Sequence, residues 1–285
     1  MARKKLDTRS IGLDIGLAFV KWLTGAENLH YGYWKGLEVT AANLRAAQEA
    51  YTDKLFALLP DRPVRILDIG GGAGETAKKL LALGHQVDIV VPSPFLAERC
   101  RENAQGARVH ECTFEEFTGQ GPFDVCLFSE SFQYIPLDQS LPKCLGLLAD
   151  GGEIVLADCF RSERFKPDAT RATVGGGHAI ANFRKALESL PLDVVSQEDI
   201  TEHTAPSVEI EQGLFNVLGY GLTRVDQELQ DKRPRVRWAL SRLLRTVMSD
   251  RKRARLDQRL NQQTRNRTVF AEHNTYVMMR LRSRG

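Results

Sequence analysis

Short apolar runs alternate with amphipathic stretches from residue 64 to residue 200. The runs that we interpret as strands are 64–68, 86–91, 107–110, 123–129, 153–158 and 192–198, and a seventh run closes the chain at 273–282. The stretches with helical periodicity between them are 75–83, 95–104, 137–148 and 178–190. Such alternation is typical of βαβ units, in which helices cover both faces of a parallel sheet. The pattern therefore predicts an α/β fold with a mostly parallel, seven-stranded sheet.

Two regions do not follow this alternation. Amphipathic helices at 8–24 and 40–58 precede the sheet, and residues 205–268 interrupt the rhythm before the last strand. We therefore expect an N-terminal helical cap at 1–60, a ligand-binding core at 61–204, a basic helical insertion or lid at 205–268, and the closing strand of the core at 269–285.

Composition narrows the class of protein. Apolar residues make up 42% and charged residues 26% of the 285, as in ordinary globular proteins. No apolar run is long enough to cross a membrane, and none is followed by a signal-peptide cleavage site. The five cysteines are odd in number and never spaced as CxxC, which favours buried thiols over disulfides or a zinc site. We expect a cytoplasmic protein without a bound metal.

Positive charge is concentrated near the C-terminus. Residues 232–267 contain thirteen Lys and Arg and two Asp, a net +11, so the other residues together carry −8 of the total of +3. Three interpretations stay open: a solvated helical lid, a contact with an anionic membrane surface, carrier protein or charged substrate, and a nucleic-acid contact. Nucleic acid is the least favoured, because no recognised RNA-binding motif accompanies the charge.

A glycine-rich turn follows the first predicted strand, in the sequence VRILDIGGGAGETAKKL at 64–80. The dinucleotide fingerprint G-x-G-x-x-G needs a third glycine where Glu75 stands, and the phosphate-loop motif needs a lysine that is absent. Asp68 would repel a pyrophosphate but would attract an ammonium group, while the helix N-terminus suits a carboxylate. The turn therefore favours a ligand with a zwitterionic amino-acid tail.

This stretch resembles the first motif of class I S-adenosylmethionine-dependent methyltransferases. The resemblance covers the sheet, about two-thirds of the chain, and implies a Rossmann-like fold that binds S-adenosylmethionine. It assigns the methionine part of the cofactor to Asp68 and to the glycines of the turn. These glycines are Gly70, Gly71, Gly72 and Gly74.

The second strand departs from the family pattern. Family members usually end this strand with an acid that binds the ribose hydroxyls, but the sequence here is VVPSP, with Val91 at that place. We expect either that Ser93 takes over the ribose contact or that the cofactor is held more loosely.

The resemblance also implies contacts after later strands. Thr113 and Phe114 follow the third strand, where the family contacts adenine. Ser129 and Glu130 follow the fourth and would face the cofactor, whereas Gln133 and Tyr134 would face the acceptor.

The sequence LHYGYW at 29–34 resembles the segment that caps the cofactor in methyltransferases of small molecules and lipids. Because aromatic faces stabilise cations, Tyr31 and Tyr33 are candidate neighbours of the sulfonium.

Methyl transfer is an in-line displacement that needs a base only when the acceptor has a proton to lose. The candidates for catalytic residues are His178, at a helix start after the fifth strand, Glu130 and Tyr134, with His30 a weaker one.

We therefore expect a biosynthetic methyltransferase that acts on oxygen, carbon or nitrogen of a hydrophobic small molecule or lipid-like acceptor. The apolar sequence GLFNVLGYGL at 213–222 is a candidate wall for the acceptor pocket. Two alternatives stay open: an enzyme of this fold that catalyses a non-methylating cyclisation or rearrangement, and a cofactor-free binding or scaffold protein that uses the basic insertion.

Overall fold

A computed structural model of the chain describes residues 8–167, 174–262 and 265–284. Residues 1–7, 168–173, 263–264 and 285, which belong in turn to the four predicted segments, lie outside this part.

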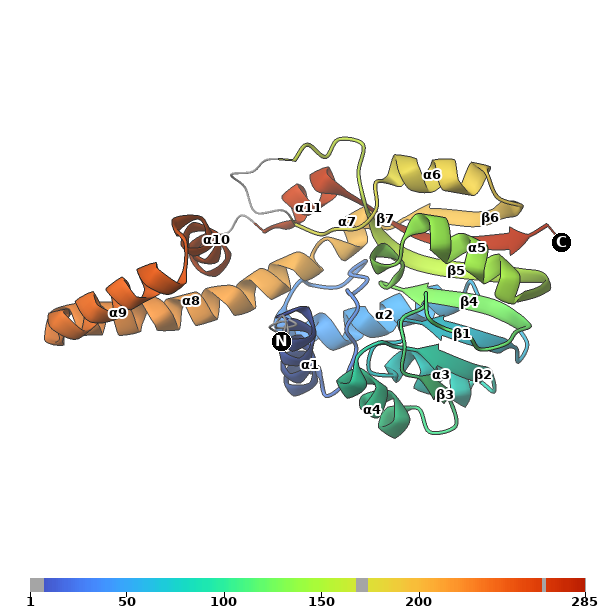
Figure 1. Cartoon of the computed structure of the whole chain (residues 1–285), viewed down its shortest axis with the longest axis horizontal. Helices are drawn as coiled ribbons and strands as arrows, with labels where there is room; N and C mark the ends of the chain where they lie inside the picture. The colour runs from blue at the N-terminus through green and yellow to red at the C-terminus, as the bar shows by residue number, and fades with distance from the viewer. Residues whose placement is uncertain (1–7, 168–173, 263–264, 285) are drawn as a thin grey trace, which may run out of the picture.

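The core is one seven-stranded sheet with helices on both faces (Figure 1). The strands are β1 Arg65–Ile69, β2 Gln86–Val90, β3 Arg108–His110, β4 Phe123–Ser129, β5 Leu148–Arg161, β6 Leu192–Asp199 and β7 Asn274–Ser283. Their order is β3-β2-β1-β4-β5-β7-β6, and only β7 pairs antiparallel with its neighbours. The predicted fold class is therefore confirmed.

Strand β5 is longer than the predicted 153–158. Its residues from Glu153 to Arg161 all pair with β7, and a separate pairing of Leu148 with Phe123 extends it at its start. The glycines at 151–152 interrupt the apolar run between these two parts, so hydrophobic periodicity does not reveal the full strand.

Each face of the sheet buries a separate apolar cluster, because successive side chains of a strand point to opposite faces. One face packs against α2 Leu44–Phe56, α3 Glu75–Ala82 and α4 Pro94–Asn103, and the other packs against α5 Leu137–Leu147 and α6 Ile180–Glu188. Both faces are thus covered, as a buried parallel sheet requires.

The N-terminal segment begins with helix α1 Thr8–Thr24 and continues through residues 25–34, which we call the cap loop, and a short 3-10 helix Ala41–Asn43 to α2. A second 3-10 helix, Phe132–Tyr134, follows β4. The cap loop crosses the carboxyl ends of the central strands.

After β6, the chain forms α7 Thr201–Thr204 and then three long helices. These are α8 Ser207–Lys232, α9 Pro234–Val247 and α10 Asp250–Asn261, and α11 Arg267–His273 leads back into β7. The outer part of α8 and the whole of α9 project away from the sheet (Figure 1). None of the described helices is long and apolar enough to cross a membrane.

Candidate functional site

A cavity of about 440 Å³ opens at the carboxyl ends of the parallel strands. Residues of the loops after β1, β2, β3 and β4 line it, together with residues 27–30 of the cap loop. This edge of an open α/β sheet is where ligands bind in doubly wound folds, and the volume suits a ligand of cofactor size. The cavity is therefore the candidate active site.

Asp68 lies at the end of β1 and lines this cavity. Its side chain is buried, and neither carboxylate oxygen has a hydrogen-bond partner among the described residues. Burial without a partner raises the pKa of Asp68 to about 7. A buried acid without a donor is costly, so this position is built for a ligand that supplies positive charge or N–H groups.

The glycine turn, residues 69–74, shapes the floor beside Asp68. Gly70 has φ +76°, and a Cβ there would lie 2.4 Å from the Cβ of Ser131. A Cβ on Gly71 would lie 2.6 Å from Oδ2 of Asp68. Side chains at these two positions would collide with Ser131 and Asp68, so only glycine lets the turn pack this closely around the carboxylate.

Gly74 has a different function from the other glycines of the turn. It does not line the cavity, its φ is +88°, and a Cβ there would lie 2.9 Å from the backbone Cα of Cys100 on α4. Gly74 thus allows α3 and α4 to pack closely, and the structure does not support its predicted contact with the cofactor.

Glu130 follows β4 and joins the cavity to the cap loop. Its carboxylate Oε1 accepts hydrogen bonds from the backbone N–H of Tyr31 at 2.7 Å and from the hydroxyl of Tyr276 at 2.8 Å. Burial raises the pKa of Glu130 to about 8, although both hydrogen bonds oppose the rise. Its φ of +58° is a strained conformation for a side chain of this size, and such strain clusters at functional sites.

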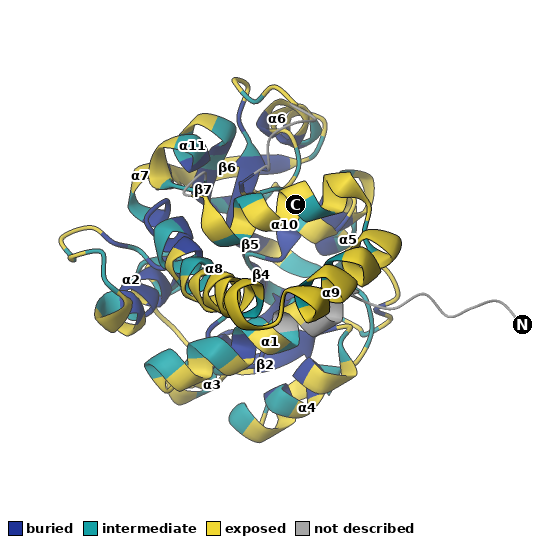
Figure 2. Ribbon diagram, turned by 90° about the vertical axis from the view of Figure 1, so that its left-hand side faces the viewer, coloured by how far each residue is buried: buried dark blue, intermediate teal, exposed yellow. Residues whose placement is uncertain are grey.

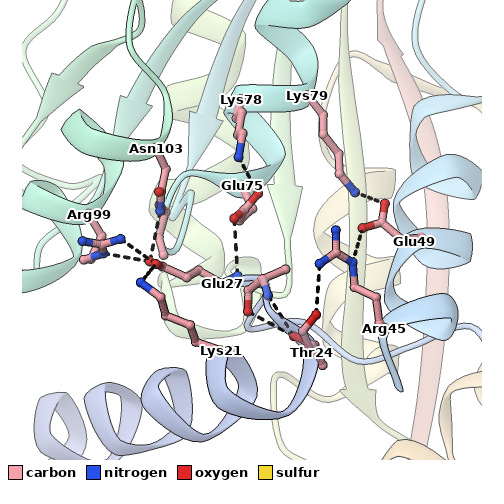
Figure 3. A network of polar contacts seen from close by, with 12 residues as sticks. Lys21, Thr24, Glu27, Arg45, Glu49, Glu75, Lys78, Lys79, Arg99 and Asn103 are labelled. Carbon is pink, nitrogen blue, oxygen red and sulfur yellow. Dashed lines mark hydrogen bonds and ion pairs between the residues drawn. The ribbon is translucent and has the colours of Figure 1, made fainter. Parts of the chain in front are cut away.

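A polar network holds the cap loop against the cavity (Figure 3). The buried carboxylate of Glu27 accepts hydrogen bonds from Lys21, from Arg99 at 2.8 Å and from Asn103 at 3.0 Å. Burial alone would raise the pKa of Glu27, but these donors outweigh it and lower the pKa to about 2. The backbone N–H of Glu27 also donates to Glu75 at the start of α3. We call these contacts the Glu27 cluster.

At the end of β2, Val91 lies in the cavity wall where the family usually has an acid. Ser93 also lines the cavity, and its hydroxyl oxygen accepts a hydrogen bond from the backbone N–H of Leu96 as the N-cap of α4. The hydroxyl proton of Ser93 remains available to a ligand.

Four more predicted residues line the cavity. They are Thr113, Phe114, Ser129 and Tyr134. Phe114 is also buried against Phe128 of the core, so its ring supports the wall as well as facing the cavity. Tyr134 lies at the mouth, where 55% of its surface is exposed.

Other predicted residues lie elsewhere. The ring of Tyr31 packs on Phe270, and that of Tyr33 contacts His203, so neither reaches the cavity. Because the cap loop turns its backbone toward Glu130, these aromatic side chains point away from the candidate sulfonium position.

His178 and Gln133 also lie outside the residues that line the cavity. The Nε2 of His178 donates to the carbonyl of Ile135 at 2.8 Å, which fixes the ring against the back of the cavity wall. Residues 213–222 likewise contribute nothing to the wall, since this part of α8 extends outward to exposed Val217 and Tyr220.

The weaker base candidate, His30, does line the cavity. Its two ring nitrogens contact the carbonyl of Tyr31 and the hydroxyl of Thr52, and burial lowers the pKa of His30 to about 4. A neutral ring with both nitrogens engaged is a poor proton acceptor at neutral pH.

Leu29, in the predicted capping sequence, does line the cavity, but sequence reasoning missed Glu27 and Asn28 before it and Ser131, whose hydroxyl donates to the carbonyl of Ile69. An acid two residues before LHYGYW was the available signal for Glu27, but its partner Arg99 lies 72 residues away.

The residues present fit the methionine part of S-adenosylmethionine. The two unpartnered oxygens of Asp68 match its ammonium group. The start of α3 has backbone N–H groups that lack intrahelical acceptors and match its carboxylate. Between them, Gly70, Gly71 and Gly72 line the cavity without side chains, so the backbone there is open to the chain that joins the two groups.

Comparison with known proteins agrees with this geometry. A family model described as a methyltransferase domain matches residues 66–152. The chain is 30% identical over 152 residues to the uncharacterized methyltransferase GK2543 of Geobacillus kaustophilus (strain HTA426), a match that covers 50% of this chain and 71% of that protein. The chain therefore belongs to the class I S-adenosylmethionine-dependent methyltransferases, and its cofactor is S-adenosylmethionine.

Two solved structures show how widely this fold is used. A geranyl diphosphate C-methyltransferase from Streptomyces coelicolor A3(2), solved with Mg²⁺, geranyl-S-thiolodiphosphate and S-adenosyl-L-homocysteine, has a TM-score of 0.63 and 14% identity, covering 93% of this chain and 91% of that one. The [4+2]-cyclase SpnF has a TM-score of 0.63 and 16% identity, covering 96% and 95%. Membership of an enzyme family sets aside the cofactor-free scaffold alternative.

Proposed function

We propose that this enzyme methylates oxygen, nitrogen or carbon of an uncharged, hydrophobic small molecule or lipid-like acceptor. The observation that carries the proposal is the charge of the cavity. Five carboxyl side chains and no lysine or arginine line it among the described residues. These acids are Glu27, Asp68, Glu75, Glu115 and Glu130. Lys21 and Arg99 pair with Glu27 from outside the lining, so an anionic acceptor would find no cationic side chain in the wall to bind it.

Apolar side chains complete the wall. Leu29, Leu96 and Ile135 line the cavity, and Tyr134 covers its mouth. Burying an apolar acceptor against them removes hydrocarbon surface from water, which is the main source of affinity for such ligands.

Asp68 and Glu130 have separate roles in the proposed reaction. When bound, S-adenosylmethionine supplies an electrophilic methyl group on a sulfonium. Asp68 holds the ammonium group of the cofactor. Glu130 accepts the acceptor's proton as the new bond to carbon forms and the bond from carbon to sulfur breaks. Both of its hydrogen bonds use Oε1, which leaves Oε2 without a partner among the described residues.

The remaining cavity residues bind the rest of the cofactor in this proposal. The hydroxyl of Ser93 donates to a ribose oxygen in place of an acid at Val91, and Thr113 and Phe114 contact the adenine. All three line the cavity, which supports this assignment.

Methyl-labelled S-adenosylmethionine tests the acceptor class with matched pairs of compounds, such as a long-chain alkylphenol and the same phenol carrying a carboxylate. We expect the neutral member of each pair to be methylated at least about tenfold faster, since like-charge repulsion costs a kcal/mol or more. Faster methylation of the anionic members, or of transfer RNA, would overturn the proposal.

Val91 favours a second candidate, a non-methylating cyclisation or rearrangement, because a loosely held ribose matters less when the methyl group stays on sulfur. This candidate predicts that an acceptor is converted to an isomer of equal mass while S-adenosylmethionine is not consumed. Mass spectrometry of acceptor and cofactor in the same reaction separates the two.

A further inference from the structure

Most of the exposed large apolar side chains belong to one projecting part of the molecule. We call residues 217–261 the arm; it comprises the outer part of α8 and all of α9 and α10. Twelve of the nineteen exposed large hydrophobic side chains of the described residues lie on it. Figure 2, which views the molecule from the side of the arm, shows the outer part of α8 and all of α9 as almost continuously exposed. Such a concentration marks an interaction surface.

Helix α9 has two chemically distinct faces. Val236, Leu240, Leu243, Leu244 and Val247 recur at helical spacing on one face, and between 45% and 73% of each is exposed. The opposite face carries three arginines. These are Arg235, Arg242 and Arg245, which form no ion pair with any described residue, and α9 contains no acid.

The neighbouring helices extend both features. On α8, Leu218, Leu222 and Val225 are more than half exposed and lie near one another at helical spacing. On α10, Arg251, Lys252 and Arg255 add exposed cations without ion pairs among the described residues. The arm therefore combines an open apolar surface with excess positive charge.

An anionic lipid surface matches this combination better than the alternatives do. A basic amphipathic helix buries its apolar face at the boundary of headgroups and acyl chains while its cations attract the headgroups. Packing two arms of two copies together would bring like charges close. Nucleic acid would use the cations but would leave the leucines and valines exposed.

We propose that the arm docks the enzyme on an anionic membrane surface. The arm contains twelve Lys and Arg and five Asp and Glu, a net +7, so the rest of the chain carries −4 of the total of +3, and a contact made through the body would be repelled. Because the arm projects outward, it contacts the surface before the acidic body does.

The arm leaves the body at the edge where the cavity opens. Strand β6 runs parallel to the central strands and ends at that edge, and α8 begins shortly afterwards. At its start, the hydroxyl oxygen of Ser207 accepts hydrogen bonds from the backbone N–H of Gly32 and from Nε1 of Trp34 in the cap loop. Docking would thus hold the cavity near the bilayer. The use of this orientation, to take up a lipid-like acceptor, rests on the proposed function, whereas the docking itself does not.

Vesicle flotation without cofactor or acceptor tests the docking on its own. The full chain is mixed with phosphatidylcholine vesicles that contain or lack phosphatidylglycerol. We expect binding to the anionic vesicles that weakens with salt. Because each cation near such a surface strengthens binding about fivefold, R235Q/R242Q/R245Q should bind roughly 100-fold more weakly.

Two further variants complete the test. L243E/L244E changes two exposed side chains and should lower binding at least about tenfold. R62Q/R184Q/R284Q removes the same number of exposed body cations and should bind like the parent. Circular dichroism checks that every variant is folded. Any of three results would overturn the proposal. These are no binding to the anionic vesicles, equal losses of binding in the two arginine variants, or sedimentation that shows the arm only joining two copies of the chain. Failure of methylation on the acceptor panel would leave this result unaffected.

Discussion

At the scale of single residues, Asp68 gives the clearest sign that the cavity binds a ligand, because a carboxyl group without a partner has no structural role in a core. A carboxyl group buried without a partner lowers the stability of the empty protein, and a cationic ligand removes this cost. The sequence could predict this residue because the apolar strand before it and the glycines after it fix its place at the strand end. The sequence could not predict that the carboxylate lacks a hydrogen-bond donor, since this depends on all the residues that pack around it in the fold.

The raised pKa of Asp68 predicts how stability changes with pH. The folded empty protein binds more protons than the unfolded chain between about pH 4 and 7, so this group's stabilising contribution is lost as pH rises through that window. Relative to D68N, the parent should lose roughly 2–4 kcal/mol of unfolding free energy between pH 5 and 8, measured by urea titration without cofactor. Parallel pH profiles for the two proteins would contradict this assignment.

Glu130 predicts a second pH dependence, in the rate. In the proposed reaction it acts as an ionised base, so the turnover of the parent should rise as pH increases toward the pKa of about 8. E130Q retains an oxygen for the N–H of Tyr31 and the hydroxyl of Tyr276, yet should lower kcat by about 10²- to 10⁴-fold and abolish this pH dependence.

The control for this variant is Y276F, which removes one hydrogen bond to Glu130 but leaves its carboxyl group in place. We expect a much smaller loss of kcat and a profile that still rises with pH. If E130Q were as active as the parent, the carboxylate would serve only to anchor the cap loop.

At the scale of elements, the pattern of apolar residues was enough to predict the sheet and most of its helices. Strand β4 begins and ends as predicted, at Phe123 and Ser129, because turn residues flank a continuous apolar run. The cap loop shows where such reasoning stops. Its aromatic sequence indicated a position over the cavity, but which side chains point inward depends on the backbone contact of Tyr31 with Glu130.

The Glu27 cluster predicts how firmly this loop is held. The low pKa of Glu27 means that its contribution is complete above about pH 4.5 and is lost as pH falls toward 2. E27Q should lower the unfolding free energy at pH 7 by about 1–3 kcal/mol, because Lys21 and half-buried Arg99 lose their buried counter-charge. Limited proteolysis should also cut faster at Lys21 and Lys35, on either side of the loop.

E38Q is the matched control, since Glu38 lies just after the same loop and is exposed. We expect unchanged stability and unchanged cleavage for this variant. Equal behaviour of E27Q and E38Q would mean that the cluster does not hold the loop.

At the scale of the whole molecule, charge is divided between two regions. The cavity gathers acids around the place of a cationic cofactor, and the arm gathers cations on helices that project from the body. The sequence indicated the basic segment, but only the fold separates Arg265 and Arg267, which pair with Glu211 and Glu209 at the base of α8, from the unpaired arginines of α9.

The central claim is that the cavity holds S-adenosylmethionine through Asp68, and calorimetric titration of the cofactor tests it most directly. We predict one-to-one binding to the parent and to E38Q, and affinity at least about 100-fold lower for D68N, since a buried charged hydrogen bond is lost. No heat at high cofactor concentration with the parent, or equal affinity for D68N, would contradict the claim.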